Sequence, residues 1–258
     1  MWIDTHCHLD NDLFINSQQV ISSSIEQNVN CIIIPAVGKS NFDQVIKLAE
    51  KNDECFYALG YHPMYLNEFQ EKDLELLEDY LLKKNSVAVG EIGLDLYVRK
   101  DNQLFQEEVF LAQLKLAKKF DLPVIMHVRG AIDLILKNLR KIKVRGGIAH
   151  AFNGSLQQGY QLIELGFKLG FGGAMTYPRA KHIQMLAKEL PIEAIVLETD
   201  SPDMSPVWLN DNEHNHPKEL SKIAEFFCQL RGIESLKTAD IIRNNTIEAI
   251  PKLAKLYT

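Results

Sequence analysis

Two histidines stand one residue apart near the start of the chain, His6 and His8 in the stretch "WIDTHCHLD" (residues 2–10). In an extended strand, residues i and i+2 point to the same face, so the two imidazoles would project together while Cys7 faces away. Two neutral imidazoles on one face can bind a divalent metal ion. A lone HxH pair is a common accident, and two partly exposed histidines on a strand edge are the alternative interpretation.

More histidines and carboxylates follow, each at the end of a later apolar run. They are His62 in "GYHP", Glu91 and Asp95 in "GEIGLD", His127 and Arg129 in "MHVR", His150 in "AHAFNG", and Glu198 and Asp200 in "LETDSP". Any one of them alone is explained as a satisfied core histidine or a solvated loop carboxylate. Together they predict a mixed nitrogen and oxygen site that is large enough for two divalent ions. His182 falls in a lysine-flanked helical pattern instead, and we expect it at the surface.

The elements that must position these residues are short apolar runs that alternate with longer amphipathic stretches. The runs cover residues 3–8, 31–37, 55–61, 87–94, 123–128, 147–152, 167–172 and 194–200. Several are apolar at consecutive positions, for example "CIIIPAV", as expected for strands that are covered on both faces. Helical patterns occupy residues 40–52, 72–84 and 103–120.

Eight such strand-and-helix units in 258 residues predict an α/β protein, a (β/α)8 TIM barrel formed by a single domain over residues 1–258. The active site of this fold lies at the C-terminal ends of the strands, where the polar residues fall. A doubly wound open sheet is the rival fold, but no GxGxxG motif follows the first strand.

Composition restricts the class of protein further. Hydrophobic residues make up 46% and charged residues 24% of the chain, as in ordinary globular proteins. The net charge of −6 argues against a broad electrostatic grip on nucleic acid, although not against an enzyme that meets phosphates through a metal. Four cysteines without a CxxC pair favour a reduced, cytoplasmic chain. We expect no targeting segment, no membrane association and no obligate protein partner, hence a monomer.

In these residues the chain resembles the TatD family of metal-dependent deoxyribonucleases, within the amidohydrolase-like metallo-dependent hydrolases. The matching motifs are "DTHCHLD", "GYHP", "GEIGLD", "LPVIMHVR", "HAFNGS", "ETDSP" and "NHP", and they cover essentially the full length. The resemblance implies a (β/α)8 barrel and divalent cofactors such as zinc, manganese or magnesium. It also implies the metal ligands His6, His8, Glu91, His127, His150 and Asp200. Two departures, His216 in "NHP" and the missing aromatic residue in "NNTIEAI", concern the substrate side.

The activity that the resemblance implies is a metal-dependent DNase, an exonuclease or phosphodiesterase acting on DNA or another phosphodiester at the barrel mouth. A metal-bound hydroxide would attack phosphorus, and Asp200 would take the proton of the water. We expect His6, His8, Glu91 and Asp200 around one of two ions, and Glu91, His127 and His150 around the other. Glu91 would bridge the two ions.

Other residues are expected to support this chemistry. Arg129 shares a strand face with His127 and could hold a phosphate oxygen, with a surface ion pair as the alternative. His62 could bind phosphate or protonate the leaving oxygen. Glu198 shares a face with Asp200 and is expected to orient a ligand histidine, and Asp95 is a second supporting carboxylate.

Two other interpretations of the function stay open. The same metals could act on a small amide, lactone or ester, although many such barrels carry a modified lysine where this chain has Glu91. The protein could also bind metal only to hold a ligand or a partner. His214 and His216 form a second HxH, which we interpret as loop and cap chemistry before Pro217 and not as a third metal site.

Overall fold

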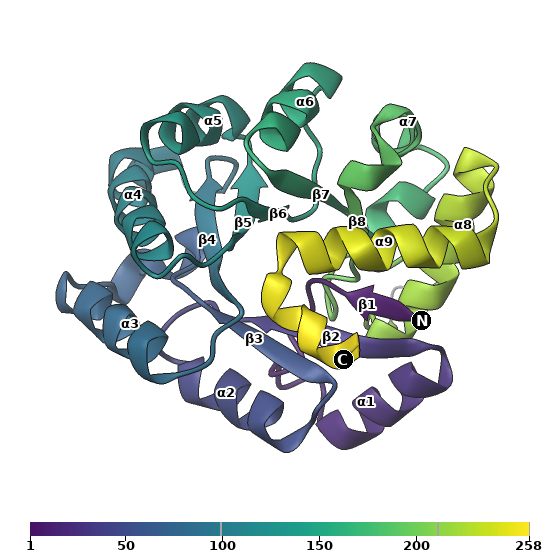
Figure 1. Ribbon diagram of the computed structural model, residues 1–258, viewed down its shortest axis with the longest axis horizontal. Helices are drawn as coiled ribbons and strands as arrows, with labels where there is room; N and C mark the ends of the chain where they lie inside the picture. The colour runs from purple at the N-terminus through teal and green to yellow at the C-terminus, as the bar shows by residue number, and fades with distance from the viewer. Residues whose placement is uncertain (99, 211, 258) are drawn as a thin grey trace.

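The computed structural model describes residues 1–98, 100–210 and 212–257, and in this part of the chain eight parallel strands form one sheet in the order β1 to β8. The strands are β1 (Trp2–Asp4), β2 (Val29–Pro35), β3 (Cys55–Leu59), β4 (Ala88–Asp95), β5 (Val124–Arg129), β6 (Gly147–Ala149), β7 (Phe167–Phe171) and β8 (Ile195–Leu197). They stand in the middle of the molecule with the helices around them (Figure 1). The predicted (β/α)8 TIM barrel is therefore confirmed.

The helices follow the strands in alternation. They are α1 (Ser17–Glu26), α2 (Phe42–Lys51), α3 (Lys72–Lys83), α4 (Gln103–Lys119), α5 (Ile132–Lys141), α6 (Leu156–Glu164), α7 (Lys181–Glu189), α8 (Leu220–Arg231) and α9 (Ser235–Ala249). The short 3-10 helices are η1 (Pro63–Glu68), η2 (Lys100–Asn102), η3 (Gly173–Thr176), η4 (Ile192–Ala194), η5 (Pro217–Glu219) and η6 (Pro251–Tyr257). Three helices, α2, α3 and α4, begin and end within two residues of the predicted ranges. None of the helices in the described ranges is both long and apolar enough to cross a membrane.

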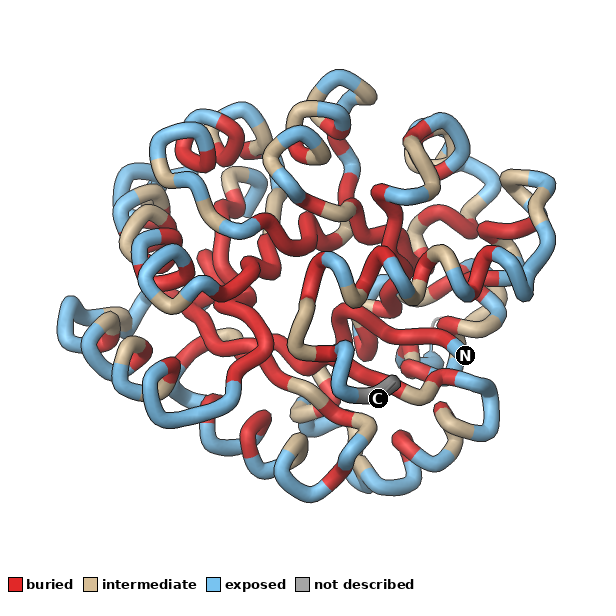
Figure 2. Tube along the Cα trace, viewed as in Figure 1, coloured by how far each residue is buried: buried red, intermediate tan, exposed pale blue. Residues whose placement is uncertain are grey.

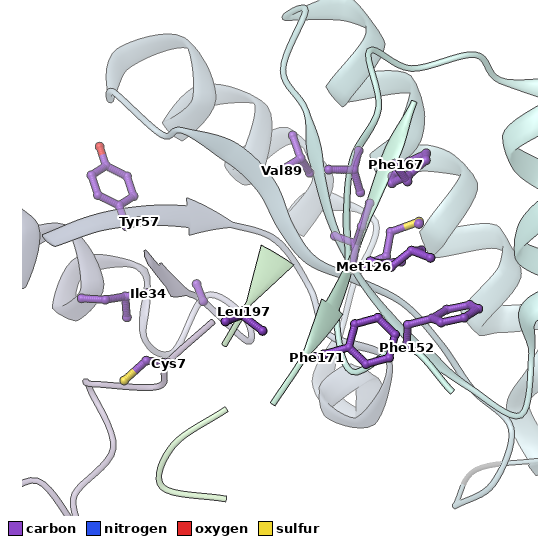
Figure 3. Packing of buried hydrophobic residues seen from close by; sticks show 14 of the residues in the cluster. Cys7, Ile34, Tyr57, Val89, Met126, Phe152, Phe167, Phe171 and Leu197 are labelled. Carbon is purple, nitrogen blue, oxygen red and sulfur yellow. The ribbon is translucent and has the colours of Figure 1, made fainter. Parts of the chain in front are cut away.

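Consecutive apolar residues in the strands serve two separate cores. In β2, Ile33 belongs to the cluster inside the barrel, whereas Ile32 and Ile34 belong to the cluster between the sheet and the surrounding helices. The outer cluster also includes Met126 and Leu197 (Figure 3). Burial is accordingly concentrated in the strands, while the outward faces of the helices are exposed (Figure 2). Strands covered on both faces explain why the apolar runs are continuous.

The C-terminal segment closes the end of the barrel that lies opposite the polar residues. The residues Ala249, Ile250 and Leu253 pack into the inner cluster, and α9 crosses the barrel in Figure 1. The Asn245 amide donates to the carbonyl oxygens of Ile192 and Ile195, both at 2.7 Å, at the start of β8. One end of the barrel is therefore sealed, which leaves the other end for a site.

The barrel seam lies between the first and last strands, and β1 is shorter than the apolar run at residues 3–8. Beyond Asp4 the chain lies between β2 and the segment after β8. The Cys7 N–H donates to Ile33 O at 3.1 Å, the His8 N–H to Ser201 O at 2.8 Å, and the Asp200 N–H to His6 O at 2.8 Å. These bonds close the seam, and they place His6 and His8 just past the strand instead of within it.

Candidate metal centre

The six predicted ligands meet at the C-terminal ends of the strands. His6 is central: its Nε2 lies 3.1 Å from Glu91 Oε2 and 3.7 Å from Asp200 Oδ1, and its ring stacks on that of His150 with a centroid distance of 3.7 Å. On the other side of Glu91, its Oε1 lies 2.9 Å from His127 Nδ1. Residues from β4 and β5 and from the segments after β1, β6 and β8 thus converge on one point.

The donor set fits a divalent metal. His6 Nε2 and His8 Nε2 face each other at 3.4 Å, which is about the separation of two nitrogens that bind one tetrahedral ion at roughly 2.0–2.1 Å. Three groups have ligand atoms that all lie within 4.8 Å of one another: His6, Glu91 and His150; His6, His8 and Asp200; and His62, Glu91 and His127. Mixed imidazole and carboxylate donors suit zinc or manganese.

The grouping differs in part from the expected one. Glu91 belongs to two of the three groups, as a bridging carboxylate should, but His150 groups with His6 and not with His127. His62, expected on the substrate side alone, lies with Glu91 and His127. The structure therefore brings the six side chains together but groups them in part differently from the expectation, and their assignment as metal ligands stays a prediction.

The surroundings of Glu91 and His6 lower the pKa values of both groups. Burial alone would raise the pKa of Glu91, but the neighbouring imidazoles of His62 and His6 hold it well below its usual range. Burial lowers the pKa of His6, and the adjacent His150 lowers it further. A lowered pKa favours the ionised form of a carboxylate and the neutral form of an imidazole, the forms in which these groups bind metals.

Two further carboxylates lie beside ring nitrogens of His127 and His150. Asp95 Oδ2 lies 3.1 Å from His127 Nε2, and Glu198 Oε1 lies 2.9 Å from His150 Nδ1. Burial opposes the charged imidazolium, yet Asp95 raises the pKa of His127 to about 8 and Glu198 raises that of His150 to about 10. The two carboxylates lie where carboxylates that orient ligand histidines are found.

The predicted substrate residues line the mouth. His62 is 6% exposed, its Nδ1 accepts the Met64 N–H at 3.1 Å, and its Nε2 lies 3.4 Å from Glu91 Oε1. Arg129 ends β5, with its Cζ 4.3 Å from the centre of the Tyr97 ring. No carboxylate in the described part of the chain pairs with Arg129, and its role toward a substrate stays a prediction.

The remaining histidines lie apart from the centre. His216 Nδ1 accepts the Lys218 N–H at 3.2 Å and so caps η5, and its ring packs on Phe14, while His214 is exposed. Neither belongs to a metal-binding group among the described residues. His182 is exposed as expected, but its Nε2 also lies 2.8 Å from Gly154 O at the edge of the mouth.

Asp4 is fully buried at the end of β1 and was not among the predicted site residues. Its carboxylate accepts the Thr199 N–H at 2.9 Å, the Thr199 hydroxyl at 2.6 Å and the His6 N–H at 3.3 Å. Burial raises the pKa of Asp4 to about 7, although the hydrogen bonds from Thr199 act against the rise. The sequence signal that could have identified Asp4 is its position as a carboxylate within the first apolar run. Asp4 ties the segment that carries His6 to the one that carries Asp200.

A cavity of about 1440 Å³ opens over the centre. Its wall includes the side chains of His8, Glu91, His127 and Asp200, and also Arg129. This volume exceeds the range of about 300–1,000 Å³ that is usual for small-molecule sites. The cavity can therefore admit a substrate larger than a single small metabolite.

Comparison with known proteins bears on what this centre does. The family described as TatD related DNase matches residues 3–251. The uncharacterized metal-dependent hydrolase YjjV of Escherichia coli K12 is 38% identical over 251 residues, which cover 95% of this chain and 96% of that protein. An uncharacterized metal-dependent hydrolase of Haemophilus influenzae is 36% identical over 266 residues, covering 98% and 95%. The crystal structure of YjjV, a TatD homolog, superposes with a TM-score of 0.93 at 37% identity, covering 97% of this chain and 98% of that one.

Proposed function

This chain belongs to the family of TatD-related DNases and is a metal-dependent hydrolase, and we propose that it hydrolyses phosphodiester bonds of DNA at the barrel mouth. The observation that carries the proposal is the convergence of five imidazoles and two carboxylates on a large cavity. Arg129 also lines this cavity and pairs with no carboxylate in the described ranges. The residues that would hold divalent ions are His6, His8, Glu91, His127, His150 and Asp200. Bound there, such ions supply an activated water and neutralise phosphate charge.

Asp200 is the carboxylate that accepts the proton of the attacking water. Its side chain is 15% exposed, whereas that of Glu91 is 2% exposed, so Asp200 is the one of the two that faces the cavity more openly. Its Oδ1 lies 3.7 Å from His8 Nε2. A carboxylate that borders the cavity in this way can act as a general base.

Arg129 and His62 bind the phosphate group. Arg129 offers a planar fork of donors that matches two phosphate oxygens, and no described carboxylate competes for it. His62 accepts the Met64 N–H through Nδ1, so a neutral ring carries its own proton on Nε2, next to Glu91. That N–H can donate to a phosphate oxygen or to the leaving oxygen.

The cellular setting is part of the same proposal. The four cysteines are buried and free, as in a reducing compartment, and we place the protein in the cytoplasm. We propose that it acts there as a monomer on DNA, without an obligate protein partner.

The experiment compares bond types on one preparation. The protein is stripped with a chelator, reloaded with zinc, manganese or magnesium, and assayed on single-stranded DNA, bis(p-nitrophenyl) phosphate, a lactone and a lactam. We expect cleavage of both phosphodiesters that is lost with the chelator and restored by the metal. Cleavage of the lactone or lactam alone would assign an amidohydrolase-like reaction instead, and turnover of none would leave a metal-dependent binding protein.

A further inference from the structure

One side of the barrel mouth carries two exposed tyrosine rings beside the candidate metal centre. Tyr65 lies in η1 and is 62% exposed, and Tyr97 lies in the turn after β4 and is 69% exposed. The segments after β3, β4 and β5 are neighbours because those strands are adjacent in the sheet. Single exposed aromatic residues need no explanation. These two, however, contact the proposed phosphate-binding residues: Tyr65 contacts His62, and Tyr97 contacts Arg129.

Tyr65 is held close to the centre by His62. The two rings meet edge to face with their centroids 5.6 Å apart, and the His62 ring is in turn 4.3 Å from that of His127. Leu66 is buried, and His62 accepts the Met64 N–H, so the backbone of η1 is anchored on both sides of Tyr65. The result is an exposed ring on a fixed support that lines the cavity.

Tyr97 is anchored to the same centre. Its backbone N–H donates to Asp95 Oδ1 at 3.0 Å, and the other oxygen of this carboxylate contacts His127. The Tyr97 ring lies under the Arg129 guanidinium at 4.3 Å. The Tyr97 ring therefore contacts a cation that lines the cavity.

The charge of the chain makes such rings important for affinity. With a net charge of −6, the protein has little to gain from the counterion release that drives most nucleic-acid binding. Stacking of bases on aromatic side chains is the other main source of affinity for single strands, and it does not depend on the base sequence because every base has a π-face.

We propose that Tyr65 is the stacking platform for a nucleobase of a single-stranded substrate, next to the phosphate that is cleaved. Tyr97 is a positioning residue that holds Arg129 flat toward that phosphate. This base subsite, formed by the Tyr65 ring, selects substrates whose terminal nucleotide carries a planar base. The proposal rests on the phosphodiesterase function proposed above.

The test uses the metal-loaded full chain and labelled single-stranded oligothymidylates that have an intact terminal base or an abasic residue at either end. Binding is measured by fluorescence anisotropy and cleavage by gel. Tyr65→Ala should weaken binding of the intact strand by about 5- to 100-fold, the loss caused by removing one base–aromatic stack. Tyr65→Phe keeps the ring and should bind like the wild type, and so should Tyr160→Ala, which removes a tyrosine of α6 that is 46% exposed.

The abasic strands identify the contact that is lost. For the end that enters the site, the wild type and Tyr65→Ala should bind the abasic strand equally weakly, since the base and the ring act as one pair. Tyr97→Leu should weaken the binding of intact and abasic strands by the same factor, because Tyr97 acts on the phosphate through Arg129. Equal binding of the intact strand by the wild type and Tyr65→Ala overturns the subsite while the function stands. Failure of every metal-loaded wild-type sample to cleave DNA overturns both.

Discussion

Glu198→Gln should weaken metal binding without disturbing the shape of the centre. Glu198 is 1% exposed, its Oε1 lies 2.9 Å from His150 Nδ1, and the same oxygen accepts the Ala151 N–H at 2.6 Å. Glutamine has the same length and can still accept the Ala151 N–H. What disappears is the negative charge that holds the proton on Nδ1 and so directs His150 Nε2 toward Asp200 and the centre.

The size of the effect follows from this arrangement. Removing a carboxylate behind a ligand histidine costs about 10- to 100-fold in metal affinity, which corresponds to about 1.4–2.7 kcal/mol. The upper part of the range applies here, because the contact is short and no water can replace a charge at a fully buried position. Activity at saturating metal should fall much less than affinity.

The assay is a competition titration of each metal against a chromophoric chelator, with thermal unfolding followed by circular dichroism as a check on folding. Glu164→Gln, at the exposed end of α6, is the matched control and should bind metal like the wild type. If Glu198→Gln unfolds cooperatively and binds metal with wild-type affinity, the inferred orienting role of Glu198 is refuted.

Two further predictions concern His127 and Asp200 at the mouth and His216, which caps η5. His127→Ala and Asp200→Ala should abolish hydrolysis with little loss of folding stability, since their side chains are 16% and 15% exposed at the mouth; full metal content and rate in either variant would contradict the site. Burial lowers the pKa of His216 to about 4, with help from Lys218, so folding excludes a proton that the unfolded chain binds below about pH 6.5. The free energy of unfolding should therefore fall as the pH drops from about 6.5 toward 4. His216→Asn keeps a cap for the Lys218 N–H and should make this fall shallower in urea titrations. An unchanged dependence of the unfolding free energy on pH would show that other groups cause the fall.

The parts of the fold and site that could be predicted are those encoded locally. Residues such as Ile33 and Ile34 are both buried although they point to opposite sides of the sheet. The strands can therefore be identified in the sequence as continuous apolar runs. A polar residue that interrupts such a run near its end, such as Glu91 or His127, must then lie near the mouth of the barrel.

The parts that could not be predicted depend on how the strand ends turn around the barrel axis. The stacking of His6 on His150 joins two segments that no local pattern relates, and the place of His62 beside Glu91 depends on the path of the chain after β3. Tyr65 and Tyr97 sit among ordinary loop and helix residues. Only the three-dimensional structure shows that Tyr65 lines the cavity and that Tyr97 packs on Arg129, which also lines it.

The seam of the barrel has a consequence for biosynthesis. Asp4 and Thr199 are hydrogen-bonded across 195 positions of the chain, and His6 and Asp200 face each other just beyond them. A nascent polypeptide leaving the ribosome therefore presents His6 and His8 long before Asp200 has been translated. A chain that ends before β8 has neither the closed seam nor the contact between His6 and Asp200, so the candidate centre is completed only with the last strand.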